Sequence, residues 1–128
     1  MIYLDTSVAL AHLLAEDLSP PEKLWQETLI SSRLIEYEVW TRIHARNLTR
    51  SHADEVRALL NRIAFIELSP PVLTRALEPF PKPMRTLDAL HLASMDFLHR
   101  QGQAIALASY DSRLTAAARA LRLPIYKL

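Results

Sequence analysis

The sequence lacks cysteine and has a single glycine among its 128 residues. Without cysteine there are no disulfides and no thiolate metal sites, and the composition suits a reducing compartment. The single glycine, Gly102, excludes a P-loop and a Rossmann fingerprint, because both need several glycines where the backbone approaches a phosphate. The five histidines follow no HExxH or paired-ligand spacing, which argues against zinc chemistry.

Long apolar runs are missing as well. No stretch approaches the roughly 20 apolar residues of a membrane span, and the N-terminus has no basic-then-apolar signal layout. We therefore expect a cytoplasmic protein with no membrane partner. At this length the chain fits one domain, which we place over residues 1–128.

Strong net charge is also absent. With 15 basic and 14 acidic side chains, the formal charge of +1 produces no strong field for nucleic acid. Residues 1–78 carry 8 basic and 11 acidic side chains, whereas residues 79–128 carry 7 basic and 3 acidic ones. Basic residues in helices are usual for solvated faces and only weakly indicate an RNA path; those concerned are Arg42, Arg46, Arg113 and Arg119.

Strand-like and helix-like segments alternate along the chain. Apolar runs predict strands at residues 2–4, 65–68, 104–108 and 125–126, with a short extended run or turn at 29–34. Helical spacing predicts helices at residues 8–14, 21–29, 34–46, 51–63, 72–77, 87–101 and 112–121. The alternation predicts an α/β fold with a short parallel sheet sandwiched by helices in three layers, α/β/α.

Several helix ends carry recognisable signals. Thr6 or Ser7 is expected to cap the first helix, and Thr86 the most apolar one. Gly102 follows that apolar helix, where a glycine commonly ends a helix. The alternate prolines of residues 79–83 remove backbone donors and fix the backbone, which predicts an ordered loop.

Two of the predicted strands end in the same way. Asp5 follows the strand at 2–4 and Asp111 closely follows the strand at 104–108; each stands among hydroxyl residues before a helix. In a parallel sheet both strand ends lie at one edge, so the two carboxylates could face one cleft. The alternative for each Asp taken alone is an ordinary helix cap.

Two further acids lie beside apolar faces of predicted helices. Asp88 stands in the first turn of the most apolar helix, where it also interacts favourably with the helix dipole. Helical spacing aligns it with His91 and Leu92, at the edge of a buried face. Glu38 is similar, and its alternative role is a solvated ion pair with Arg42 one turn later.

The acids Glu36 and Asp96 are weaker candidates, which we expect to be surface charges.

Four carboxylates brought together would repel, at about 1 kcal/mol per close pair in water and about 4 kcal/mol at intermediate dielectric. Such a cluster requires a cation or bound protons. An all-oxygen site suits Mg²⁺ or Mn²⁺, and the chemistry that follows is metal-assisted hydrolysis of a phosphodiester.

Four segments, in this order and spacing, resemble those of PIN-domain ribonucleases, and in particular the VapC-like toxins of type II toxin–antitoxin modules. They are MIYLDTSVAL, the helix carrying Glu38 after SSRL, MRTLDALHLAS and ASYDSRL, of which MRTLDALHLA is the most specific. The resemblance covers essentially the whole chain. It implies a single PIN-like nuclease domain that cleaves RNA with Mg²⁺ or Mn²⁺.

The resemblance also implies the residues of the site. The catalytic and metal-binding acids would be Asp5, Glu38, Asp88 and Asp111, with Thr6, Ser7 and Ser109 as supporting hydroxyls. Ser109 stands where the family commonly has Thr, and it keeps the hydroxyl. Glu36 and Glu38 lie about 200° apart on a helix, so only one can face the cleft. We choose Glu38 from its register with Leu34 and Ile35 and from the family's spacing.

The partners implied by the resemblance are an RNA substrate, a cognate antitoxin whose C-terminal segment blocks the site, and a second copy in a homodimer. The aromatic side chains of Trp25, Tyr37 and Trp40 could serve such interfaces, although core packing is the more ordinary role. Arg85, just before Thr86, could meet a phosphate or pair with an acid.

Two other classes of function are alternatives to this one. Haloacid-dehalogenase-like enzymes need a second Asp two residues after the first, where this chain has Ser7. Receiver domains need a later strand-end lysine, and Lys23, Lys82 and Lys127 are not well placed for it. The other alternative is a catalytically silent PIN-fold module that binds RNA or protein; retention of all four acids argues against it.

Overall fold

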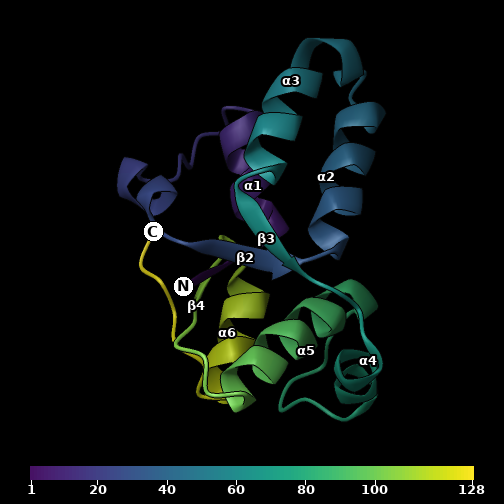
Figure 1. The fold of residues 1–128 in the computed structure, drawn as a ribbon, viewed down its shortest axis with the longest axis vertical. Helices are drawn as coiled ribbons and strands as arrows, with labels where there is room; N and C mark the ends of the chain where they lie inside the picture. Colours follow the sequence, from purple (N-terminus) through teal and green to yellow (C-terminus); the bar gives the residue numbers. More distant parts are fainter.

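Four short parallel strands form the centre of the molecule, in the order β3-β2-β1-β4 (Figure 1). The computed structural model describes residues 1–128. The strands are β1 (Ile2–Leu4), β2 (Leu29–Ser32), β3 (Ile63–Ile66) and β4 (Ala106–Ala108). All three neighbouring pairs are parallel, with Tyr3 of β1 paired to Ile30 on one side and to Leu107 on the other. The predicted parallel α/β sheet is therefore confirmed.

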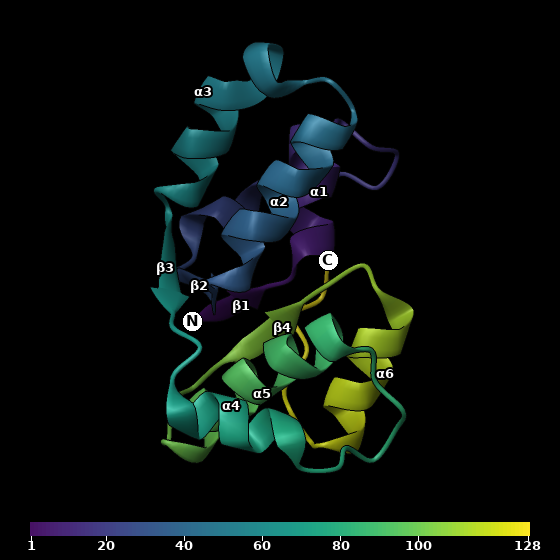
Figure 2. The ribbon, with the colours of Figure 1, turned by 90° about the vertical axis from the view of Figure 1, so that its right-hand side faces the viewer.

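Helices cover both sides of this sheet (Figures 1 and 2). One side carries α1 (Thr6–Leu13), α2 (Leu34–Ala45) and α3 (Thr49–Leu60), and the other carries α4 (Pro70–Leu77), α5 (Thr86–Arg100) and α6 (Ser112–Ala120). A short 3-10 helix, Glu22–Gln26, precedes β2. None of the helices has the length and apolar character that crossing a bilayer requires. The arrangement is the predicted three-layer α/β/α fold.

The apolar side chains of β1 divide between two cores. Successive strand residues point to opposite faces. Ile2 and Leu4 join a cluster of 16 buried residues with α1, α2 and α3, whereas Tyr3 joins a cluster of nine with α5 and α6. A strand buried on both faces reads as a continuous apolar run, which is why three consecutive apolar residues mark the centre of this sheet.

Some boundaries differ from the sequence prediction. The helix predicted from residue 51 begins at Thr49 and ends at Leu60, and Ile63 is the first residue of β3 rather than the last of the helical stripe. Correspondingly, β3 spans Ile63–Ile66 and not 65–68. The spacing of Leu59, Leu60 and Ile63 fits a helix and a turn into a strand equally well, so apolar periodicity alone could not place the boundary.

The predicted caps at the starts of two helices are wrong, whereas the prediction that Gly102 follows the end of a helix is confirmed. Thr6 and Thr86 are the first helical residues, behind Asp5 and Arg85 as N-caps, and neither helix has a side-chain cap. Gly102 follows α5 with a φ of 86°, in the left-handed region that favours glycine, and its amide donates to the carbonyl of His99 at 3.0 Å. The proline-rich loop at 79–83 is irregular, as predicted. The predicted strand at 125–126 is reduced to a single bridge between Leu107 and Ile125.

Asp96, predicted to be a surface charge, is buried instead, with 5% of its surface exposed. Its Oδ2 accepts a hydrogen bond from Nε of buried Arg75 at 2.7 Å, and Nε of Arg100 lies 3.1 Å away. The guanidinium of Arg75 also stacks 4.3 Å from the ring centre of Phe80. This ion pair joins α4 to α5. The sequence could not reveal it, because the two partners lie 21 residues apart on different helices.

We expect Asp96→Ala to destabilise the protein by about 3 kcal/mol, because it removes the buried counter-charge of Arg75 and leaves only the exposed carboxylate of Glu78, 3.9 Å away. Urea unfolding followed by circular dichroism measures this change. Asp54→Ala is the matched control, since Asp54 is fully exposed and pairs only with Arg57 on the same helix; no measurable change is expected there. Equal stability of the two variants would contradict a structural role for the buried pair.

Candidate active site

The carboxyl ends of β1 and β4 bring Asp5 and Asp111 to one edge of the sheet. Leu4 pairs with Ala108 across the two strands, and the Asp5 amide donates to the Ala108 carbonyl at 3.0 Å. Asp5 is the N-cap residue of α1, and Asp111 that of α6. Oδ1 of Asp111 accepts hydrogen bonds from the amides of Arg113 and Leu114 at 2.9 and 3.3 Å, so this acid also performs the ordinary capping role.

Two serine hydroxyls hold the Asp5 carboxylate. Its Oδ2 accepts hydrogen bonds from Ser7 at 2.6 Å and from Ser109 at 2.8 Å. The two serines accept in turn from backbone amides of the β4–α6 turn, Ser7 from Tyr110 at 3.0 Å and Ser109 from Asp111 at 2.9 Å. The hydroxyls therefore tie the two strand ends together. All side-chain hydrogen bonds to Asp5 use Oδ2, so Oδ1 has no partner within the protein.

Glu38 reaches the same region from α2. Its Oε1 accepts a hydrogen bond from the Thr6 hydroxyl at 3.0 Å, and Nε2 of His91 bonds to the same oxygen. Glu36, the alternative acid two residues earlier, lies 3.8 Å from Arg33 in an exposed ion pair. The structure thus brings Glu38 to Thr6 and leaves Glu36 outside.

Asp88, in the first turn of α5, experiences the charges of the other three acids. Burial raises the pKa of its carboxyl, and the negative charges of Asp111, Asp5 and Glu38 raise it further, against a smaller opposite effect of His91. Like charges raise a carboxyl pKa only when they lie near it. The four acids therefore share one electrostatic environment, to which four separate segments of the chain contribute.

His91 is a site residue that the sequence analysis did not select. Nδ1 of this buried ring lies 2.8 Å from the Tyr3 hydroxyl, and Nε2 bonds to Glu38. Burial opposes the charged form of the ring, but the hydrogen bond and charge of Glu38, together with Asp5 and Asp88, outweigh it and raise the pKa of His91. Its position three residues after Asp88, on one helical face, was the available signal.

The donor set suits a hard divalent cation, because all four acids offer oxygen and neither Lys nor Arg forms an ion pair with any of them. Burial, and after it the negative charges of the neighbouring acids, raise the pKa of Asp88, and a bound cation would offset both effects. No three His, Asp or Glu side chains of the chain already stand close enough together to hold a metal ion. The four acids therefore have the ligand atoms and the charge that such an ion requires, but their side chains do not form a complete coordination sphere.

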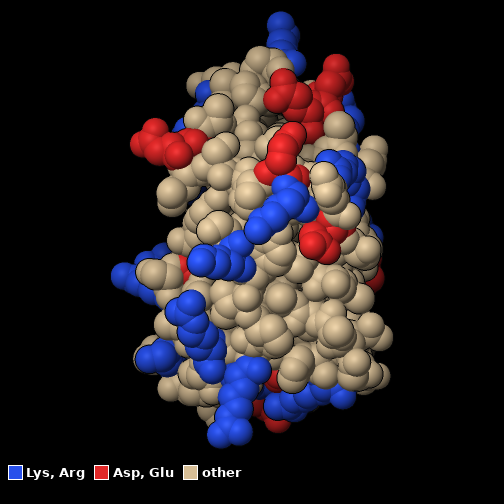
Figure 3. Space-filling model, turned by 90° about the vertical axis from the view of Figure 1, so that its left-hand side faces the viewer, with Lys and Arg blue, Asp and Glu red and all other residues tan.

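Two grooves border the acids. One of about 350 Å³ contains Thr6 and Glu38 and is flanked by exposed Tyr37, by Leu87 and by Arg42. The other, of about 500 Å³, runs beside Asp111 at the start of α6 and is lined by Lys82, Pro83, Ser112, Arg113 and Ala116. Figure 3 shows one face of the molecule, where Lys and Arg side chains gather over the half that contains α4, α5 and α6.

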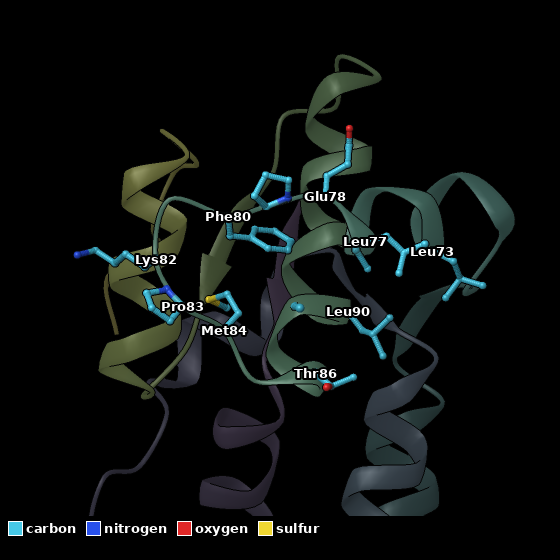
Figure 4. A pocket seen from close by; sticks show the side chains of 12 residues that line it. Leu73, Leu77, Glu78, Phe80, Lys82, Pro83, Met84, Thr86 and Leu90 are labelled. Atoms are coloured by element: carbon cyan, nitrogen blue, oxygen red, sulfur yellow. The ribbon is translucent and has the colours of Figure 1, made fainter.

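A further cavity, of about 520 Å³, is lined by none of the four acids (Figure 4). Apolar side chains of α4, of the proline-rich loop and of α5 form it, among them Leu73, Phe80, Met84 and Leu90. Leu77 at its rim is 89% exposed. Exposed apolar side chains around a hollow are typical of a surface that meets another protein. In contrast, Trp25 and Trp40 pack against the larger core cluster.

Comparison with known proteins agrees with the fold. The PIN-domain family model matches residues 2–120. The chain is 30% identical over 126 residues to ribonuclease VapC47 of Mycobacterium tuberculosis strain CDC 1551, covering 93% of this chain and 90% of that protein. It is 31% identical over 131 residues to ribonuclease VapC35 of the same strain and of strain H37Rv, covering 98% of this chain and 95% of theirs. The chain belongs to the PIN-domain family, as its motifs predicted.

Proposed function

We propose that this protein is a metal-dependent endoribonuclease and the toxin component of a toxin–antitoxin system. The observation that carries the proposal is that the neighbouring strands β1 and β4 bring Asp5 and Asp111 to one edge of the sheet, where no Lys or Arg pairs with either acid. Glu38 reaches the same edge through its hydrogen bond with Thr6, and the pKa of Asp88 is raised by burial and by the charges of the other acids. The names of the relatives, which are ribonucleases, support the same reaction. We further propose that residues 1–128 act as one domain in the cytoplasm.

In this proposal the four acids bind one or two Mg²⁺ or Mn²⁺ ions. A bound ion would supply positive charge that activates water and stabilises the transition state of phosphodiester hydrolysis. Asp5 and Glu38 each have one oxygen saturated by protein donors, so Oδ1 and Oε2 are the atoms free to bind. Asp88, with a pKa raised by burial and by the neighbouring acids, takes up a proton more readily than an ordinary aspartate when no cation is present.

The supporting hydroxyls act by orientation. Ser7 and Ser109 fix the Asp5 carboxylate, and Thr6 fixes Glu38. The grooves on either side of the acids offer a path for the RNA substrate. Lys82 and Arg113 would contact phosphates in one, and Tyr37 offers an aromatic face in the other. A silent binding module is the second candidate, but it would not require four carboxylates without a Lys or Arg partner.

The partners that we propose are a cognate antitoxin and a second copy of the chain. The cavity between α4 and α5, with its exposed leucines, is the apolar surface best suited to a protein partner. Blocking of the acidic site by the antitoxin would explain how a cell that encodes the nuclease survives.

We expect the purified protein to cleave RNA with Mg²⁺ or Mn²⁺ and to stop when EDTA removes the metal. Asp5→Asn and Asp88→Asn should each lower the cleavage rate by about 100-fold or more, because each removes a carboxylate charge from the site. Gel-based cleavage assays measure the rate, and circular dichroism verifies folding. Asp54→Asn, a change of the same kind on exposed α3, is the control. If both site variants cut RNA at the wild-type rate, the proposed site is wrong.

The pKa of His91 in metal-free protein is expected to lie above its usual value of 6.5. The ion pair with Glu38 then stabilises the fold at pH below the unfolded pKa, and this contribution is lost as pH rises through the folded pKa. Glu38→Gln should lower the pKa of His91, because the negative charge is gone while burial remains. NMR titration of the ring protons in EDTA measures both values. An unchanged pKa in the variant would show that Glu38 does not control the ring.

Expression of the chain in bacteria should arrest growth, whereas expression of Asp5→Asn at the same level should not. Co-expression of the reading frame adjacent to its gene should restore growth, if that frame encodes the antitoxin. Colony counts after induction measure both effects. Growth arrest by the Asp5→Asn variant equal to that of wild type would favour the silent binding module.

A further inference from the structure

His91 connects three elements at the base of the acidic site. The ring is 1% exposed and lies on α5, one helical turn after Asp88. One of its nitrogens bonds to Tyr3 on β1 and the other to Glu38 on α2. Tyr3 is equally buried, with 1% exposed. Neither aromatic side chain is open to solvent, so neither can touch a substrate.

The direction of the hydrogen bonds follows from the Glu38 carboxylate, which can only accept, so Nε2 of His91 donates to its Oε1. A neutral ring with its hydrogen on Nε2 accepts at Nδ1, and the Tyr3 hydroxyl, 2.8 Å away, donates to it. The Tyr3 oxygen also accepts from the Ser32 amide at 3.1 Å. Protonation of the ring leaves the Nε2 donor in place.

The consequence for Glu38 is a restricted carboxylate. The Thr6 hydroxyl and the His91 ring both donate to Oε1, from α1 and α5 respectively. Two donors on one oxygen limit rotation of the carboxylate and leave Oε2 without a partner. The Asp5 carboxylate is restricted in the same way, because the hydroxyls of Ser7 and Ser109 both donate to its Oδ2. Asp5 is held by the hydroxyls of two serines, whereas Glu38, on a separate helix, is held in part by the buried side chains of Tyr3 and His91.

We propose that Tyr3 and His91 are positioning residues, which hold the Glu38 carboxylate so that Oε2 is available to a divalent cation. This inference rests on the proposed metal-dependent function. Partners that hydrogen-bond a metal-binding group fix its orientation, and their loss typically lowers metal affinity or activity by about 10- to 100-fold. A purely structural role would lower stability and leave the affinity of the folded protein for metal unchanged.

The test compares Mn²⁺ affinity, measured by calorimetry on the folded protein without RNA. Tyr3→Phe and His91→Leu should each weaken binding about 10-fold. His91→Gln should bind close to wild type, because its amide nitrogen replaces Nε2 as the donor to Glu38. Tyr126→Phe removes the same atom from a tyrosine at the edge of the other core cluster and is the control. In RNA cleavage, kcat should fall with the affinity at limiting Mn²⁺, while KM for RNA stays constant.

The outcomes separate the two proposals. If the wild type binds Mn²⁺ and cuts RNA, but folded Tyr3→Phe and His91→Leu bind Mn²⁺ as tightly, the positioning role is wrong and the proposed function stands. If the wild type neither binds Mn²⁺ nor cuts RNA, the proposed function fails and this inference fails with it. Should His91→Leu not fold, Tyr3→Phe decides, because it removes a single oxygen and keeps the ring in the core.

Discussion

Repulsion among the carboxylates at one edge of the sheet is the constraint on which the rest of this structure depends. Asp5 and Asp111 lie there because β1 and β4 are parallel neighbours, and Asp88 and Glu38 arrive from helices on opposite sides. Bringing negative charges together costs free energy, and the cost rises as water is excluded. A fold that brings such acids to one edge is stabilised by a cation or by bound protons, which is why we propose metal-dependent chemistry for this site.

The surrounding polar side chains restrain the carboxylates rather than neutralise them. Hydroxyl groups and one imidazole each donate a hydrogen bond to one oxygen of an acid. Ser7 donates to Asp5 in this way, and His91 donates to Glu38. Guanidinium groups are used elsewhere. Arg75 and Arg100 meet Asp96 at the opposite end of the site helix, where the buried ion pair fixes α5 against α4. The helix that carries Asp88 is therefore held in place by an ion pair whose arginines do not pair with the acids of the site.

Much of the fold, and the meeting of Asp5 and Asp111 at one edge of the sheet, was predictable because the signals are local. The apolar run 2–4, its repetition near residue 106 and the alternation with helices indicate a buried parallel sheet, and parallel strands end at one edge. Local patterns misled where partners are distant. Asp96 lies four residues before Arg100, a spacing typical of an exposed ion pair on a helix, yet its carboxylate is buried and pairs with Arg75 of another helix. The end of α3 was misplaced because Ile63 suits either a helical face or the strand that follows.

By itself, the sequence determined the α/β class of fold and most of its alternation of strands and helices, since apolar runs and helical periodicity are properties of neighbouring residues; the set of four acids came from the family resemblance and stays a prediction. Only the tertiary structure decided which oxygen of each acid is occupied, that Glu36 stays outside with Arg33, and that Tyr3 and His91 connect β1 to Glu38 through the protein interior. Hydrogen-bond partners separated by 53 and 88 residues leave no local pattern, because their meeting is produced by packing of whole elements.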